Sequence, residues 1–280
     1  MLPPPQRHLP KPLSEIWPRL KPPLRPSSGD LALFQQSIDG WTAGQQVGAP
    51  PPQVLLLGAT PELRDLDWPA GSRITVLERD SGAVSEVWKG PLESVHVKDW
   101  LTLTPQDGPF DIVLCDAGLH TLNYPKAQAE LAKVLADVTL AGAIVVLRLL
   151  CPPSQHESTV RVASELWAGN ISDMSQLMLR TAQSMQQSAA TGVRISTVWL
   201  KLRSLSKNWE TLAERTGWAM EDIQTADLYR FSAAKFHYPD LAQTMALFGH
   251  NGTGDFEMIR LSTGDGPLAA QCPVVTFERQ

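Results

Sequence analysis

The sequence predicts an α/β fold built on a doubly wound, mostly parallel sheet with an antiparallel strand at its C-terminal end. Between residues 50 and 150, short apolar runs alternate with amphipathic segments, and this alternation implies right-handed crossovers and parallel strands. The last part of the chain instead holds two strand-like runs, 255–261 and 273–279, with Gly264 and Gly266 between them. Such a pair is typical of antiparallel strands that close a sheet.

The alternating region gives a specific order of elements. It predicts strands at 53–57, 73–78, near 94–97, at 110–115 with Asp116 at the end, and at 143–149; helices are expected at 61–66, 81–88 and 126–137. Residues 140–150 form the longest apolar stretch. Because Arg148 interrupts it and it falls short of the roughly 18 residues that a membrane span needs, we expect an interior strand there.

Two segments flank or interrupt this order. Residues 1–49 read as an N-terminal unit: a proline-rich arm over 1–28 without helical periodicity, then an amphipathic helix over 30–43. We expect the arm to be extended or partly ordered, to lie outside the core and to serve as a candidate lid. Trp17 and Trp41 have two interpretations, closure over the site or packing in the core, and we favour the core. Residues 50–280 form the main domain, with a helical insert predicted at 155–235.

Composition narrows the classes of function. The chain has 280 residues, 43% of them hydrophobic, a net charge of −5, and three cysteines without metal or redox spacing. The charge gives no electrostatic footprint for nucleic acid. The cysteines suit a reducing cytoplasm and buried packing, and we expect no metal site. The first seven residues lack the apolar core of a signal peptide, so we expect a cytoplasmic protein without a membrane partner and leave a homodimer open.

The turn after the first strand points to a nucleotide site. Gly58 follows the apolar run 54–57, Thr60 can cap a helix, and Pro61 suits the first helical position. Glu78 ends the second strand, 20 residues after Gly58, where an acid can accept hydrogen bonds from ribose hydroxyls. Asp80 follows two residues later and is the alternative acceptor.

The same turn also indicates which nucleotide. A dinucleotide site needs further glycines so that the backbone can approach a pyrophosphate, but this turn has one, followed by Pro61 and Glu62. Proline has no N–H to offer a phosphate, and a carboxylate repels it. This disfavours a nicotinamide-dependent reductase. A ribose with a cationic, amino-acid-like tail fits better, and S-adenosylmethionine is such a ligand.

These motifs resemble those of the class I S-adenosylmethionine-dependent methyltransferases over residues 50–150. Residues 55–62, Leu-Leu-Leu-Gly-Ala-Thr-Pro-Glu, look like the first motif of a subgroup with a Gly-x-Thr-Pro-Glu turn, and 76–80 and 110–116 resemble the second and fourth motifs. The resemblance implies a class I methyltransferase-type fold that binds S-adenosyl-L-methionine. It assigns cofactor contacts to the following residues: Gly58, Thr60, Glu62, Glu78, Arg79, Asp80, Asp99, Trp100 and Asp116.

Within that set, the resemblance places Glu78 at the ribose and Asp99 at the adenine amino group. Asp116 ends a parallel strand, where ligands of such sheets bind. Glu62 has two interpretations: a contact to the ammonium group of the cofactor, or a first-turn acid that suits the helix dipole. The turn 139–142, Thr-Leu-Ala-Gly, departs from the usual Lys-Pro-Gly-Gly of the family.

The candidate catalytic residues lie in the loop 119–125, which the resemblance places over the transferred methyl group. His120 could accept a proton, Tyr124 could hold its ring against the sulfonium, and Asn123 lies between them. We therefore predict methyl transfer to a small molecule. The alternative on the same fold is a cyclase that converts S-adenosylmethionine to azetidine-2-carboxylate and methylthioadenosine, and a non-catalytic binding module is a further alternative.

Overall fold

Seven strands form a single sheet in the order β3-β2-β1-β4-β5-β9-β8, in which β9 is the only antiparallel strand among the described residues. The computed structural model describes residues 12–249 and 255–280. The strands are β1 (Gln53–Leu57), β2 (Arg73–Glu78), β3 (Val95–Val97), β4 (Phe110–Asp116), β5 (Thr139–Arg148), β8 (Phe256–Ser262) and β9 (Val274–Arg279). This is the mostly parallel, doubly wound sheet that the sequence predicts, and the fold class is confirmed.

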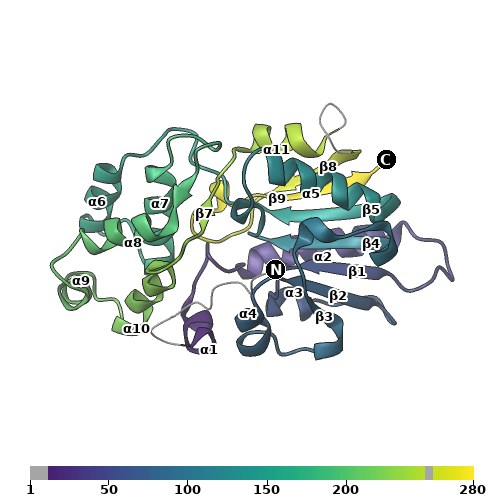
Figure 1. Cartoon of the computed structure of the whole chain (residues 1–280), viewed down its shortest axis with the longest axis horizontal. Helices are drawn as coiled ribbons and strands as arrows, with labels where there is room; N and C mark the ends of the chain where they lie inside the picture. Colours follow the sequence, from purple (N-terminus) through teal and green to yellow (C-terminus); the bar gives the residue numbers. More distant parts are fainter. Residues whose placement is uncertain (1–11, 250–254) are drawn as a thin grey trace.

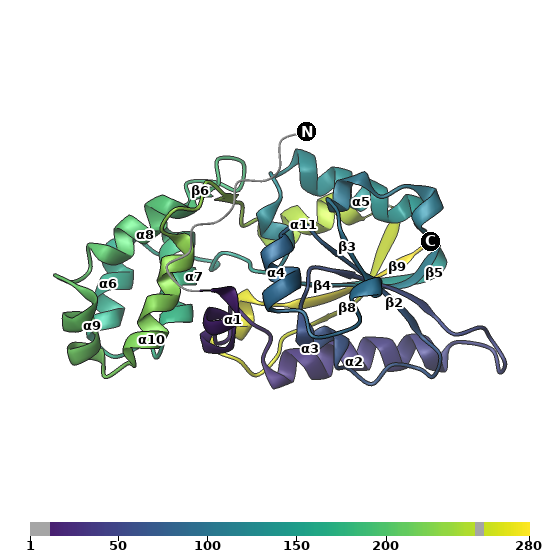
Figure 2. The same cartoon turned by 60° about the horizontal axis from the view of Figure 1, so that its bottom comes forward.

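Helices cover both faces of this sheet. On one face lie α2 (Ser28–Ala43) and α3 (Pro61–Arg64); on the other lie α5 (Lys126–Asp137) and α11 (Leu241–Phe248) (Figure 2). The short helix α4 (Ser81–Glu86) follows β2. Helices α2, α4 and α5 were predicted within two residues of their ends. Helix α3 ends two residues earlier than predicted. The Trp68 indole N–H donates to the Arg64 carbonyl (3.1 Å) in place of a backbone N–H, and Pro69 disfavours a helical conformation at Trp68.

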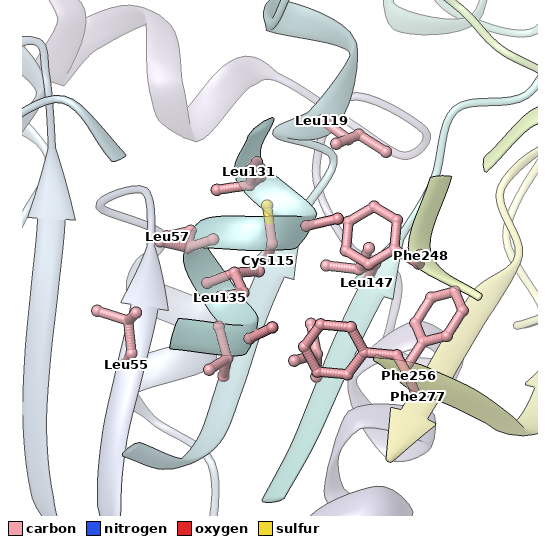
Figure 3. Packing of buried hydrophobic residues seen from close by; sticks show 14 of the residues in the cluster. Leu55, Leu57, Cys115, Leu119, Leu131, Leu135, Leu147, Phe248, Phe256 and Phe277 are labelled. Atoms are coloured by element: carbon pink, nitrogen blue, oxygen red, sulfur yellow. The ribbon is translucent and has the colours of Figure 1, made fainter. Parts of the chain in front are cut away.

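The core is built from strands whose side chains alternate between the two faces. Val54 and Leu56 of β1 pack with α2, whereas Leu55 and Leu57 pack with α5. Figure 3 shows the second layer, where leucines of α5 lie over β1 and β4 beside three phenylalanines of α11, β8 and β9. Because every residue from 54 to 57 is buried, both faces of β1 are apolar, as expected of a central parallel strand.

The segment after β5 forms a second body with a core of its own. Its helices are α6 (Thr159–Trp167), α7 (Met174–Met185), α8 (Ile195–Arg203), α9 (Trp209–Thr216) and α10 (Met220–Ile223), and a two-stranded ribbon joins β6 (Val193–Arg194) to β7 (Lys235–Phe236). In Figure 1 this body lies beside the carboxyl ends of β4 and β5. It therefore stands where ligands of parallel sheets bind.

The N-terminal arm corrects one expectation. We expected an extended or partly ordered segment outside the core. Residues 13–19 form α1 (Leu13–Ile16) and the 3₁₀ turn η1 (Trp17–Arg19), and Leu13, Ile16 and Leu20 are buried, so the arm is not outside the core. The arm spans both bodies, since Lys21 Nζ lies 3.0 Å from Asp222 in the insert and Arg25 pairs with Glu62 of α3. Burial of its apolar side chains offsets the low helical tendency of a proline-rich sequence. The part of the predicted arm before residue 12 lies outside the described residues.

All three cysteines are buried and free, so their predicted role as small packing residues is confirmed. Within the described ranges, no helix is both long enough and apolar enough to span a membrane.

Candidate functional site

A cavity of about 320 Å³ opens where β1, β2 and β4 end, and both the arm and the insert help to enclose it. Its size lies in the range of small-molecule sites. Many of the residues that the sequence singled out line it: Gly58, Thr60, Glu78, Arg79, Asp80, Asp99, Trp100, Asp116 and His120. The fold thus brings into one cavity residues spread over more than 60 positions of the chain, from Gly58 to His120.

The first turn of the site depends on Gly58. Its φ of +105° is a conformation that other residues rarely adopt, and it folds the chain back so that the Ala59 N–H donates to Glu78 Oε2 (3.2 Å). Glu78 Oε1 accepts from the Asp80 N–H (2.7 Å). Two backbone donors therefore fix the Glu78 carboxylate at the edge of the cavity, where its remaining lone pairs can accept hydrogen bonds from a ligand.

The second wall comes from the loop after β3. Asp99 caps the 3₁₀ turn η3 (Trp100–Thr102) by accepting from the Leu101 N–H (3.0 Å), which orients the carboxylate. The Trp100 indole donates to the Leu77 carbonyl (2.9 Å), and its ring lies between the Gly58 turn and Gly118. The contact leaves no room for a side chain at Gly118, since a Cβ there would meet the ring at 2.6 Å.

Beneath the cavity, Asp116 forms a buried ion pair with Arg148, its partner in the β4–β5 register. Arg148 is 1% exposed and also donates to the Pro23 carbonyl of the arm (3.0 Å). Burial raises the pKa of Asp116, and the Arg148 charge opposes that shift. The Arg148 Nη2 atom is buried without a partner. The pair joins the sheet, the cavity and the arm.

His120 lies where the loop after β4 meets the insert. Its ring stacks on Tyr238 (5.3 Å between centroids) and meets Phe236 edge-on (4.5 Å). Burial, followed by the positive charge of Arg148, lowers the pKa of His120 to about 3, while the Ala117 carbonyl opposes the shift. The imidazole is therefore neutral at physiological pH, and its Nδ1 is buried without a hydrogen-bond partner.

Three of the predicted site residues lie outside the lining. Glu62 pairs with Arg25 of the arm, which leaves its Oε2 buried and unpartnered. Asn123 is exposed, and its carbonyl accepts from the Ala127 N–H (2.9 Å) at the start of α5. Tyr124 is half-buried beside it. Of the three candidate catalytic residues in this loop, His120 lines the cavity, whereas Asn123 and Tyr124 do not.

Other lining residues were not predicted. The arm contributes Leu13, Trp17, Leu20 and Leu24. Trp17 thus has the role at the site that was the less favoured of its two interpretations, while Trp41 of α2 packs against the core cluster as expected. The insert and the end of β5 contribute Leu150, Met178, Ile195, Leu228, Tyr229, Ser232 and Phe236. No short motif joins these positions. One signal in the sequence could have pointed to this region: Arg148 is a charged residue within an apolar strand, and it lies beneath the cavity.

The sequence matches no family model and no curated protein sequence. A solved structure from Rhodobacter sphaeroides, named for the Zn-dependent alcohol dehydrogenases, aligns over 97% of this chain and 100% of its own, with a TM-score of 0.58 and 13% identity. At that identity the likeness concerns the fold alone. Among residues 12–249 and 255–280, no three His, Cys, Asp or Glu side chains gather closely enough to hold a metal ion.

Two more distant structures are methyltransferases solved with S-adenosylhomocysteine. One is magnesium protoporphyrin IX methyltransferase from Synechocystis, with a TM-score of 0.45, 12% identity, and coverage of 95% of this chain and 94% of its own. The other is the N-methyltransferase NodS from Bradyrhizobium japonicum, with a TM-score of 0.44, 10% identity, and coverage of 89% and 86%.

Proposed function

We propose that the protein is an S-adenosylmethionine-dependent methyltransferase that acts on a small molecule. One observation carries the proposal: Glu78 and Asp99, at the ends of neighbouring strands, line the same cavity as the Gly58 turn. This is the edge of a doubly wound sheet at which nucleotides bind. The single-glycine turn with Pro61 suits a nucleoside without a phosphate.

The residues around the cavity fit such a nucleoside. Glu78, held by the Ala59 and Asp80 amides, would accept from the ribose hydroxyls, and Asp99 would accept from the adenine amino group. Trp100 contributes an aromatic ring to the same lining. Glu62 lies outside the lining and pairs with Arg25, so we assign it no contact with the ligand.

Bound S-adenosylmethionine supplies an activated methyl group on a sulfonium. The protein's task in such a displacement is to hold the acceptor in line with that group and to exclude water. The insert and the arm enclose the cavity for this purpose. We assign the proton-accepting position to His120, because it lines the cavity whereas Tyr124 does not.

The test is calorimetric titration with adenosylhomocysteine, using wild type and Asp99→Ala. We expect saturable one-to-one binding, weakened in the variant. Absence of binding to the wild type would contradict the proposal and favour a binding module for another ligand. Incubation with S-adenosylmethionine alone addresses the cyclase alternative: we expect intact cofactor, and accumulation of methylthioadenosine without an acceptor would instead establish the cyclase.

A further inference from the structure

Charge is distributed unevenly along the wall of the cavity. The five charged lining residues all end or follow β2, β3 or β4 at the proposed nucleotide edge: Glu78, Arg79, Asp80, Asp99 and Asp116. The described lining residues from the insert and the end of β5, which we call the insert half, are uncharged: Leu150, Met178, Ile195, Leu228, Tyr229, Ser232 and Phe236. A charged molecule placed there would lose hydration without gaining an ion-pair partner.

The wall of the insert half is mainly aliphatic and contains two aromatic rings, Tyr229 and Phe236. Met178 and Ile195 are at most 1% exposed, so they are packed firmly from behind. Tyr229 meets the Phe236 ring edge-on at 6.2 Å, and Phe236 in turn meets His120 at 4.5 Å. Aromatic rings packed in this way favour a flat aromatic ligand, because its ring can make the same edge-to-face contacts.

A few neutral polar groups interrupt this wall. His120 lines the cavity, and its neutral imidazole has one nitrogen that can accept a hydrogen bond. The hydroxyls of Tyr229 and Ser232 belong to lining residues. Burial raises the pKa of Tyr229 well above its usual value, so the phenol stays protonated. Each of these groups can form a hydrogen bond with a hydroxyl group of the ligand while both the protein group and the ligand are uncharged.

We propose that the insert half binds an uncharged aromatic molecule bearing a hydroxyl group, which donates its hydrogen bond to the His120 imidazole. That this molecule is the methyl acceptor rests on the proposed function. In the transfer, an O–CH₃ bond forms as the S–CH₃ bond breaks and its electron pair stays on sulfur. The hydroxyl proton leaves along the hydrogen bond to His120 and passes to solvent, so adenosylhomocysteine and a methyl ether result.

Three probes of one shape test the charge preference: 2-naphthol, the anion 2-naphthoate and the cation 2-naphthylmethylammonium. Equilibrium dialysis is run with and without adenosylhomocysteine, so the result does not depend on nucleoside binding. We expect 2-naphthol to bind at least about tenfold more tightly than either charged probe. Equal or tighter binding of a charged probe, or no binding of 2-naphthol, would overturn the proposal.

A second measurement tests His120 itself. In His120→Phe a ring still packs against Phe236 and Tyr238, but the imidazole acceptor is removed. Wild type should prefer 2-naphthol to naphthalene, and the variant should lose that preference. The matched control is His96→Phe, an exposed histidine of β3 outside the cavity, which should keep it. A preference that survives in His120→Phe would contradict the assignment.

Adenosylhomocysteine binding separates the two proposals. If the nucleoside binds but 2-naphthol does not, the acceptor class is wrong and the methyltransferase proposal stands. If 2-naphthol binds with the expected preference but the nucleoside does not, the insert half is an aromatic site and the methyltransferase proposal fails.

Discussion

The two halves of the cavity are built in different ways. In the half formed by Gly58, Glu78, Asp80, Asp99 and Asp116, which we call the nucleotide half after its proposed ligand, carboxylates at strand ends are fixed by nearby backbone amides, as Glu78 is by Ala59 and Asp80. In the insert half, side chains from Leu150 to Phe236 form an apolar wall with neutral hydroxyl and imidazole groups. The first half depends on local spacing along the chain, and the second depends on how a separate helical body docks against the sheet.

Arg148 connects the two halves. It ends β5, pairs with Asp116 below the cavity and holds the Pro23 carbonyl of the arm, while Leu150, two residues later, lines the insert half. A buried guanidinium with these partners keeps the arm, the sheet and the start of the insert in fixed positions. Substituting Arg148 therefore tests whether the two halves depend on each other.

Arg148→Met should have the largest effect. Removing the guanidinium leaves the Asp116 carboxylate buried without a counter-charge, which costs about 3–5 kcal/mol of unfolding free energy. Urea denaturation measures the loss. The control is Arg161→Met, whose side chain is 68% exposed and pairs with Glu165 on the surface of α6; it should change stability by less than about 0.5 kcal/mol. Similar losses in both variants would contradict a structural role for the buried pair.

Gly118→Ala should disturb the nucleotide half through packing. The new Cβ would lie 2.6 Å from the Trp100 ring and 2.7 Å from Cys115 Sγ, both of which are held in place, so we expect a destabilisation of about 1–3 kcal/mol with weaker nucleoside binding. Gly40→Ala in α2 meets its nearest atom at 3.9 Å and should stabilise the protein by about 0.5–1 kcal/mol. Thermal unfolding of the pair provides the measurement, and equal shifts would rule out the Trp100 clash.

Glu78→Ala should weaken adenosylhomocysteine binding by about 1–3 kcal/mol, because ribose hydroxyls would lose a charged acceptor. Calorimetry measures the change, and Glu93→Ala, an exposed acid outside the cavity, is the control. Binding of 2-naphthol in the insert half should be unaffected. Unchanged nucleoside affinity in Glu78→Ala would transfer the ribose role to Asp80.

The pKa of His120 gives a pH test. Because it is lowered from 6.5 to about 3, the imidazole is neutral in both the folded and the unfolded chain above pH 6.5. Below pH 6.5 the unfolded chain binds a proton that the folded chain does not, so stability falls as pH falls towards 3. Between pH 7 and 5, wild type should therefore lose more unfolding free energy than His120→Phe. Parallel curves in urea titrations would mean that His120 is accessible to protons in the folded protein.

Tyr124→Phe should have the smallest effect. The side chain lies outside the cavity lining, so turnover and stability should stay within about 0.5 kcal/mol of wild type. Steady-state assays with the accepted substrate measure turnover. A marked loss of activity would instead support the catalytic role that the loop sequence predicted, and would mean that the loop moves when ligands bind.

Local patterns in the sequence were enough to predict the sheet and the strand-end residues that line one half of the cavity. Val54–Leu57, the Gly58 turn and Glu78 could be predicted because strand periodicity, a positive-φ glycine and the spacing to an acid are all local properties of the chain. The ends of α5 and β2 follow from the same local patterns.

Only the tertiary structure decided the rest of the site. Met178, Ile195 and Phe236 have the composition of ordinary core residues, and nothing local distinguishes a side chain that faces a cavity from one that faces a helix. The arm likewise folds because its leucines find apolar partners, and Trp17 reaches the cavity by that docking. Burial depends on the packing of elements far apart in the chain, so the insert half was fixed only when the second body met the sheet.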